Sequence, residues 1–165
     1  MLIYICAMNF YQKLGGLILG SRLRRISEYF LSEVNKVYAE KGIPFDASWF
    51  SIFYLISKNE HISLIDIAET LEVSHSAISQ LAKSLEQKGL LESYPSEHDG
   101  RKRLIRFTEQ GRQLQQAVEP VWVELDQAMQ ELMQENEANA ALLSSLLSVE
   151  QSFAQKSLSQ RLLKQ

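Results

Sequence analysis

Four basic side chains fall close together in one polar segment, at Arg101, Lys102, Arg103 and Arg106. Guanidinium groups pair with phosphate, and an arginine can enter a narrow minor groove of duplex DNA, where the negative potential is enhanced. Asp99 could pair with the Arg101 guanidinium and hold it in one rotamer, which lowers the entropy lost on binding. We therefore interpret Arg101, Lys102 and Arg103 as DNA-binding residues supported by Asp99, with a solvated hairpin as the alternative.

A second group of candidate contacts lies on a helix that the sequence predicts from about residue 75 to residue 88. Helical spacing would place Ala77, Ile78, Leu81 and Leu85 against a core and would leave small or hydrogen-bonding side chains outside. Such side chains suit base edges and phosphates in a major groove about 12 Å wide. The predicted contacts are Ser74, His75, Ser76, Ser79, Gln80 and Lys83.

Aromatic side chains recur at helical spacing in the segment that follows Asp46. They could wall a pocket for a small molecule, although aromatic residues at this spacing more often belong to a core. The candidate ligand-pocket residues are Tyr38, Trp49, Phe53, Tyr54 and His61.

The sequence gives little support for metal binding, a reactive thiol or catalysis. The three histidines, His61, His75 and His98, lack metal-ligand spacing with acidic residues on one helix face. The single cysteine, Cys6, has no basic neighbour that would stabilise a thiolate. No serine lies in a nucleophile elbow and no glycine-rich phosphate loop occurs. We therefore predict no catalytic residues, no metal site and no cofactor.

The candidate contacts must be positioned by a mainly helical chain with a small hairpin. One helix is predicted over about 10–41, a second from Asp46 to about 58, and a short third over 64–71 behind a Ser63–Asp66 capping box. Further helices are predicted after the cap at Thr108 and over about 142–162. Alternating strands at 90–94 and 103–107 flank a hairpin turn. This order is a winged helix-turn-helix, in which the helix over 75–88 enters the major groove.

Charge and composition limit the class of protein. The 165 residues carry 17 basic and 20 acidic side chains, a net charge of −3, so any nucleic-acid surface must be local. Residues 109–165 hold four basic against eight acidic residues and cannot supply it. No apolar run reaches the ~18 residues of a membrane span, and we expect a cytoplasmic protein.

Several segments together resemble the multiple-antibiotic-resistance regulator (MarR) family of transcriptional regulators. They read SLIDIAETL at 63–71, VS at 73–74, LEQKGLL at 85–91, DGRKR at 99–103 and FTEQG at 107–111. The segments at 20–25 and 45–50 further resemble the regulator half of proteins that join this module to an acetyltransferase, and this chain has no room for that second domain.

The resemblance implies a homodimer that pairs its first and last helices and binds a pseudo-palindromic operator in double-stranded DNA. It implies that Asp99 supports Arg101 in the minor groove, and that a small-molecule effector releases a repressor. The expected parts are an apolar extension at 1–9, an N-terminal dimerisation helix at 10–45, the DNA-binding domain at 46–108 and C-terminal dimerisation helices at 109–165. Residues 1–7, which Met8 follows directly, have neither helical period nor cap, and we interpret them as a mis-assigned start or a frayed extension.

One residue departs from the pattern of the family. Glu72 occupies a position in the tight turn where the family commonly has glycine. A residue with a side chain costs about 1 kcal/mol in the left-handed conformation that such a turn needs, so the turn is expected to be strained or reshaped. Two other functions stay open: a protein-interaction module that has kept the fold without DNA binding, and a protein whose main role is to bind an effector.

Overall fold

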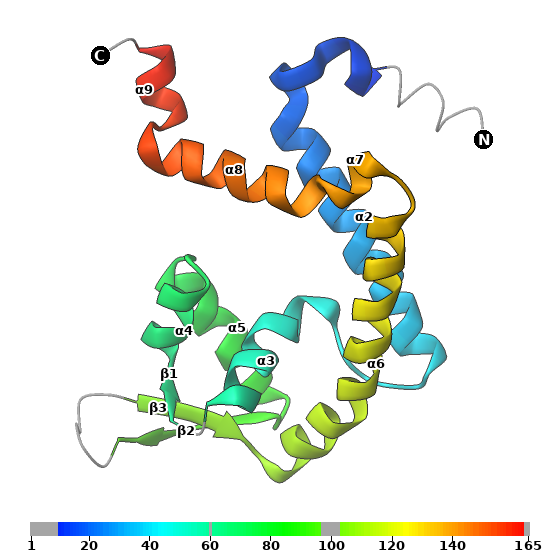
Figure 1. Cartoon of the computed structure of the whole chain (residues 1–165). Coiled ribbons are helices and arrows are strands. Elements are labelled where there is room, and N and C mark those ends of the chain that lie inside the picture. The colour runs from blue at the N-terminus through cyan, green and yellow to red at the C-terminus, as the bar shows by residue number, and fades with distance from the viewer. Residues whose placement is uncertain (1–9, 60, 97–102, 164–165) are drawn as a thin grey trace. The chain divides into compact units, whose positions relative to one another are not determined.

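The computed structural model describes residues 10–59, 61–96 and 103–163, and the chain divides after Val118 into two compact units. Three residues of the predicted DNA contact, Asp99, Arg101 and Lys102, lie outside the described residues. Most described residues are helical, and the strands form one small sheet (Figure 1). The predicted fold class, mainly helical with a β-hairpin wing, is confirmed.

The first unit holds most of the elements. In chain order they are η1 (Gly15–Ile18), α2 (Leu19–Glu40), η2 (Ala47–Trp49), α3 (Phe50–Lys58), β1 (Ile62–Ser63), α4 (Leu64–Thr70), α5 (His75–Gln87), β2 (Leu91–Pro95), β3 (Arg103–Phe107) and the beginning of α6 (Glu109–Gln134). The second unit contains the rest of α6, then α7 (Glu137–Ala140), α8 (Leu142–Gln155) and α9 (Leu158–Leu162).

The sheet has three antiparallel strands in the order β1-β3-β2. The sequence predicted only the hairpin of β2 and β3, whose register pairs Leu91 with Phe107. The third strand, β1, is two residues long and pairs Ile62 with Ile105. It is too short to show a period of two in the sequence, because two residues make no alternation.

Two predicted helices are interrupted. The helix expected over 10–41 is broken at Gly15, where φ is +50° and a 3-10 turn precedes α2. The helix expected over 142–162 ends at Gln155, because Ser157 and Gln160 form a capping box that begins α9. Ser157 accepts from the Gln160 amide at 3.2 Å, and the Gln160 side chain accepts from the Ser157 amide at 2.8 Å. A glycine with a positive φ therefore interrupts the apolar periodicity at the first place, and a capping box interrupts it at the second.

Helices α3, α4 and α5 pack against the sheet and enclose the core of the first unit (Figure 1). The core includes aromatic rings from distant segments, since the Phe53 centroid lies 5.0 Å from that of Phe45 and 4.9 Å from that of Phe107. The fully buried large side chains are Tyr38, Phe53, Ile52, Ile67, Leu85, Ile105 and Val118. Among the described residues, no helix is both long enough and apolar enough to cross a membrane.

The junction between α5 and α6 is a close backbone contact. Thr108 caps α6, because its hydroxyl accepts from the Gly111 amide at 3.0 Å and donates to the Gly89 carbonyl at 2.6 Å. Gly111 lies so close to the Leu90 backbone that a Cβ added to Gly111 would stand 1.9 Å from the Leu90 carbonyl oxygen. A side chain at position 111 cannot fit unless the backbone moves.

Gly111→Ala should lower the free energy of unfolding by about 3 kcal/mol, because the added methyl group meets backbone rather than a movable side chain. Gly20→Ala is the matched control: Gly20 lies in α2 with open space around its Cβ position, so this change should stabilise by about 0.5 kcal/mol. Urea unfolding of both variants measures the difference. Equal stabilities would show that the junction is not tight.

Candidate functional site

Each helix of the α4–α5 pair begins with a side-chain cap. Ser63 accepts from the Asp66 amide at 3.2 Å, and the Asp66 carboxylate accepts from the Ser63 amide at 3.0 Å. This is the capping box that the sequence predicted. Ser74 accepts from the Ala77 amide at 3.2 Å, so its hydroxyl begins α5. The two caps set where each helix starts and therefore which side chains α5 turns outward.

The buried face of α5 consists of Ile78, Ala82 and Leu85. Leu81 is half-buried, and Ala77 is exposed, which corrects the predicted place of Ala77 in the core. Residues 78, 82 and 85 follow the spacing of one helix face, and Ala77 lies about 100° from Ile78 around the helix. Ala77 therefore lies outside the buried face, as do the predicted contacts.

The predicted contacts on α5 are mostly exposed. His75, Ser76, Gln80 and Lys83 are open to solvent, and Ser79 is half-buried. The Ser79 hydroxyl lies 3.4 Å from Nδ1 of the His75 ring. From His75 to Leu85 the helix carries Lys83 and no acidic residue. Ala77 was not predicted to belong to this outward surface. The helical spacing of Ile78, Ala82 and Leu85 was the signal that could have placed Ala77 outside the buried face.

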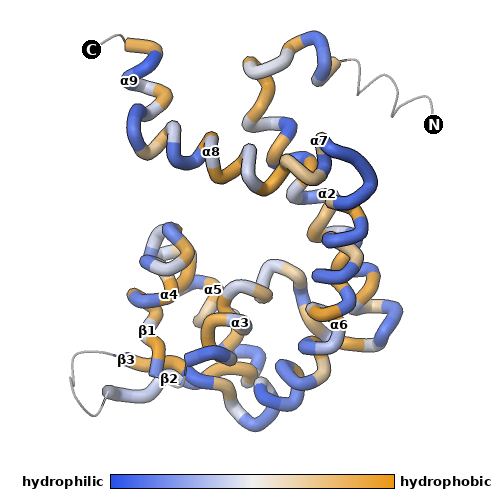
Figure 2. The backbone as a smooth tube through the Cα atoms, in the orientation of Figure 1, coloured by the Kyte–Doolittle hydropathy of each residue, from blue (hydrophilic) through white to orange (hydrophobic). Residues whose placement is uncertain are grey.

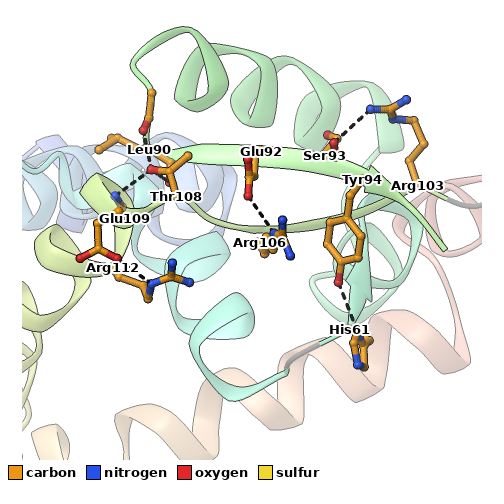
Figure 3. A network of polar contacts seen from close by, with 12 residues as sticks. His61, Leu90, Glu92, Ser93, Tyr94, Arg103, Arg106, Thr108, Glu109 and Arg112 are labelled. Atoms are coloured by element: carbon orange, nitrogen blue, oxygen red, sulfur yellow. Dashed lines mark hydrogen bonds and ion pairs between the residues drawn. The ribbon is translucent and has the colours of Figure 1, made fainter. Parts of the chain in front are cut away.

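The wing, defined as the β2–β3 hairpin, carries two described arginines with partners of their own (Figure 3). Arg103 donates from Nη2 to the Ser93 carbonyl at 3.2 Å. Arg106 donates to the Glu92 carboxylate at 2.8 Å and stacks over the Tyr94 ring at 4.7 Å. These contacts fix Arg106 on the strand, whereas Arg103 is the first residue of β3.

A hydrogen bond joins α5 to the wing. The Ser93 hydroxyl on β2 donates to the Glu86 carboxylate near the end of α5, and both side chains are half-buried. A half-buried bond to a charged acceptor is among the stronger hydrogen bonds in proteins. It ties strand β2 of the hairpin to α5. The sequence gave no signal for this pair, because seven residues and a change of element separate its members.

Three of the five candidate pocket residues, Tyr38, Trp49 and Phe53, pack around the Phe45 ring, with centroid distances of 5.1, 5.5 and 5.0 Å. Tyr38 and Phe53 are fully buried, whereas Tyr54 and His61 are exposed. The His61 ring lies 3.2 Å from the Tyr94 hydroxyl, which joins the start of β1 to β2 (Figure 3). Trp49 is half-buried and borders an open hollow of about 430 Å³, whose other lining residues are Pro44, Lys88, Leu90, Gln110, Gln113 and Leu114.

Arg22 and Arg24 on α2 are exposed, whereas Arg25 is half-buried. Arg24 donates to Glu28 at 2.7 Å, and this hydrogen bond and charge raise the pKa of Arg24 above its ordinary value. Both side chains are exposed, so the pair adds little to stability. The Arg25 guanidinium lies 4.7 Å from the centroid of the Tyr11 ring. In the described part of the chain, no group of three or more metal-ligating side chains occurs.

The turn between α4 and α5 contains a strained residue. Glu72 has a φ of +53°, and among the described residues it is the one non-glycine with a positive φ. The expected strain at this position is therefore present. Two backbone hydrogen bonds close the turn. The Glu72 amide donates to the Glu69 carbonyl, and the Val73 amide donates to the Ala68 carbonyl.

Comparison with known proteins identifies the fold. A model described as MarR family matches residues 42–102. A helix-turn-helix transcriptional regulator of Bacillus subtilis, YdgJ, which is itself uncharacterised, is 31% identical over 91 residues. That match covers 52% of this chain and 54% of the relative, so the chain spans about half of the relative's length.

Solved structures match more of the chain at lower identity. The MepR–DNA complex of S. aureus is 22% identical with a TM-score of 0.68, covering 82% of this chain and 97% of that one. The repressor CouR, bound to a 23-mer DNA duplex, is 24% identical with a TM-score of 0.65, covering 83% and 96%. PcaV from Streptomyces coelicolor, in complex with its natural ligand, is 17% identical with a TM-score of 0.63, covering 82% and 92%. At these identities the likeness establishes the fold.

Glu72→Gly should raise the free energy of unfolding by about 1 kcal/mol, because glycine adopts a positive φ without a steric penalty. Glu72→Ala is the matched control, since alanine removes the charge and keeps the Cβ, and it should give no comparable gain. Urea unfolding midpoints measure both. A glycine variant no more stable than the alanine variant would contradict strain at this turn.

Proposed function

We propose that the chain is a sequence-specific DNA-binding transcriptional regulator of the MarR family, whose model matches residues 42–102. One observation carries this function: α5 turns a polar, exposed surface outward while a bond from Glu86 to Ser93 holds the wing beside it. We assign it no catalytic activity, since the family is one of regulators.

The size and polarity of the outward surface suit the major groove. Helix α5 has 13 residues, about 20 Å of helix, and its outward side chains are small or capable of hydrogen bonds. A glutamine such as Gln80 can bind adenine through two hydrogen bonds, and an exposed alanine such as Ala77 can contact a thymine methyl group. Lys83 would contact a phosphate. The wing would then bring Arg101, Lys102 and Arg103 towards the adjacent minor groove, supported by Asp99.

Exposed apolar faces favour a homodimer. On α2 a stripe of apolar side chains at helical spacing faces solvent, composed of Leu19, Leu23, Ile26, Phe30 and Val37. On α8 a second exposed set includes Leu142, Leu143, Leu147 and Phe153, and Figure 2 shows hydrophobic residues recurring along this helix. Contiguous apolar surface of this kind marks an interaction site. A second copy of the chain would cover these faces and present two copies of α5 to a pseudo-palindromic operator.

A dimer makes the DNA contact sensitive to small movements. The two half-sites of such an operator lie about 34 Å apart, one helical turn, so spreading the two α5 helices by a few ångströms would weaken both contacts together. A small-molecule effector that favours the spread state would release the protein from DNA. We therefore propose a repressor that acts by occupying a promoter and is released by an effector.

Lys83→Ala should weaken binding to duplex DNA of any sequence and reduce the slope of log K against log salt by about 1, because one phosphate contact no longer releases a counterion. Lys36→Ala is the matched control, since Lys36 is also exposed and pairs with Glu33 on α2. Fluorescence anisotropy across a salt series measures both. Binding that is independent of salt, or absent from the folded wild type, would favour the protein-interaction module.

Ile26→Glu should convert the dimer to a monomer, because a charge would enter the centre of the apolar stripe on α2. Ser32→Glu is the matched control, since Ser32 is exposed and lies about 120° from Ile26, on the side of the same helix away from the stripe. Light scattering coupled to size exclusion measures the mass of each variant. A dimer that survives Ile26→Glu would exclude this stripe from the interface.

A further inference from the structure

Glu72 combines a strained backbone with a position beside the proposed DNA-binding helix. The other positive φ angles among the described residues belong to glycines, at Gly15, Gly42 and Gly89. Glycine at position 72 would remove the steric cost of a φ of +53°. Strain of this kind gathers at functional sites, where the residue serves a purpose other than stability.

The Glu72 side chain borders a shallow hollow beside the start of α5. The hollow encloses about 480 Å³ and is lined by Ile65, Ala68, Glu69, Glu72, Val73 and His75. Ile65 and Val73 are exposed apolar residues, and Glu69 and Glu72 bring two carboxylates to the same wall. Within the described part of the chain, neither carboxylate has an ion pair that would neutralise it. The surface around the first turn of α5 is therefore locally acidic.

This negative charge lies close to two predicted DNA contacts. Glu72 stands two residues before Ser74, which caps α5, and three before His75. Three residues span at most about 11 Å even when fully extended. The Debye length is about 10 Å at 0.1 M salt, so a carboxylate at this distance acts on phosphates that approach the start of α5. Without a nearby carboxylate, the free N–H groups at the N-terminal turn of a helix attract anions such as phosphate.

We infer that Glu72 limits the affinity of this protein for DNA of any sequence, because its carboxylate repels the phosphates nearest the start of α5. This inference rests on the proposed DNA binding. The repulsion acts on the backbone and is independent of the bases, so it weakens operator and non-operator complexes by the same factor. Its effect is to keep the protein exchanging between DNA and solution, since a weaker complex dissociates faster.

Glu72→Gln tests the charge alone, because glutamine keeps the size of the side chain and the cost of the positive φ. The variant should bind a mixed-sequence duplex and a selected operator about threefold more tightly than the wild type at 0.05 M salt. The gain should shrink towards none at about 0.3 M salt, where the charges are screened. Glu72→Gly should bind like Glu72→Gln and should also have a higher melting temperature.

Glu131→Gln is the matched control for net charge, since Glu131 is an exposed acid on α6 in the second unit and its neutralisation should leave DNA affinity unchanged. Equal affinities of Glu72→Gln and the wild type at low salt would overturn the inference. Weaker binding by Glu72→Gln to an operator with cytosine at one position would also overturn it, because the carboxylate would then accept a hydrogen bond from that base. A folded wild type that binds no duplex would refute the proposed function, and this inference with it.

Discussion

The burial of Ile78, Ala82 and Leu85 against the core decides which side of α5 faces out. These three side chains fix the rotation of the helix about its own axis, and the Ser74 cap fixes where it begins. The polar surface of α5 follows from these two constraints. The Glu86–Ser93 bond then extends the constraint to strand β2, which holds the described part of the wing against α5.

The same rigidity continues into the next helix. Thr108 and Gly111 place the start of α6 directly on the backbone at Gly89 and Leu90, which is where α5 has just ended. The sequence at 107–111 that resembles the MarR family thus has a physical basis in this structure: the threonine caps α6, and the glycine permits contact between two backbones. Such a junction holds the end of α5 close to the start of α6.

Local signals in the sequence predicted local structure well. The Ser63–Asp66 capping box, the hairpin and the strain at Glu72 each depend on neighbouring residues, and the structure confirms them. Contacts between distant residues were not predictable: the strand β1 pairs with a segment some forty residues later, and Glu86 meets Ser93 across two elements. The place of Ala77 was wrong because apolarity was taken for burial, whereas the helix geometry buries the positions that share a face with Ile78.

The whole account rests on the claim that α5 reads a DNA sequence. Selection of duplexes from a random library by the wild-type chain tests this claim most directly. The account predicts a pseudo-palindromic consensus with half-sites about one helical turn apart, because two copies of α5 would read the two halves. A folded, dimeric chain that enriches no sequence from the library would contradict it.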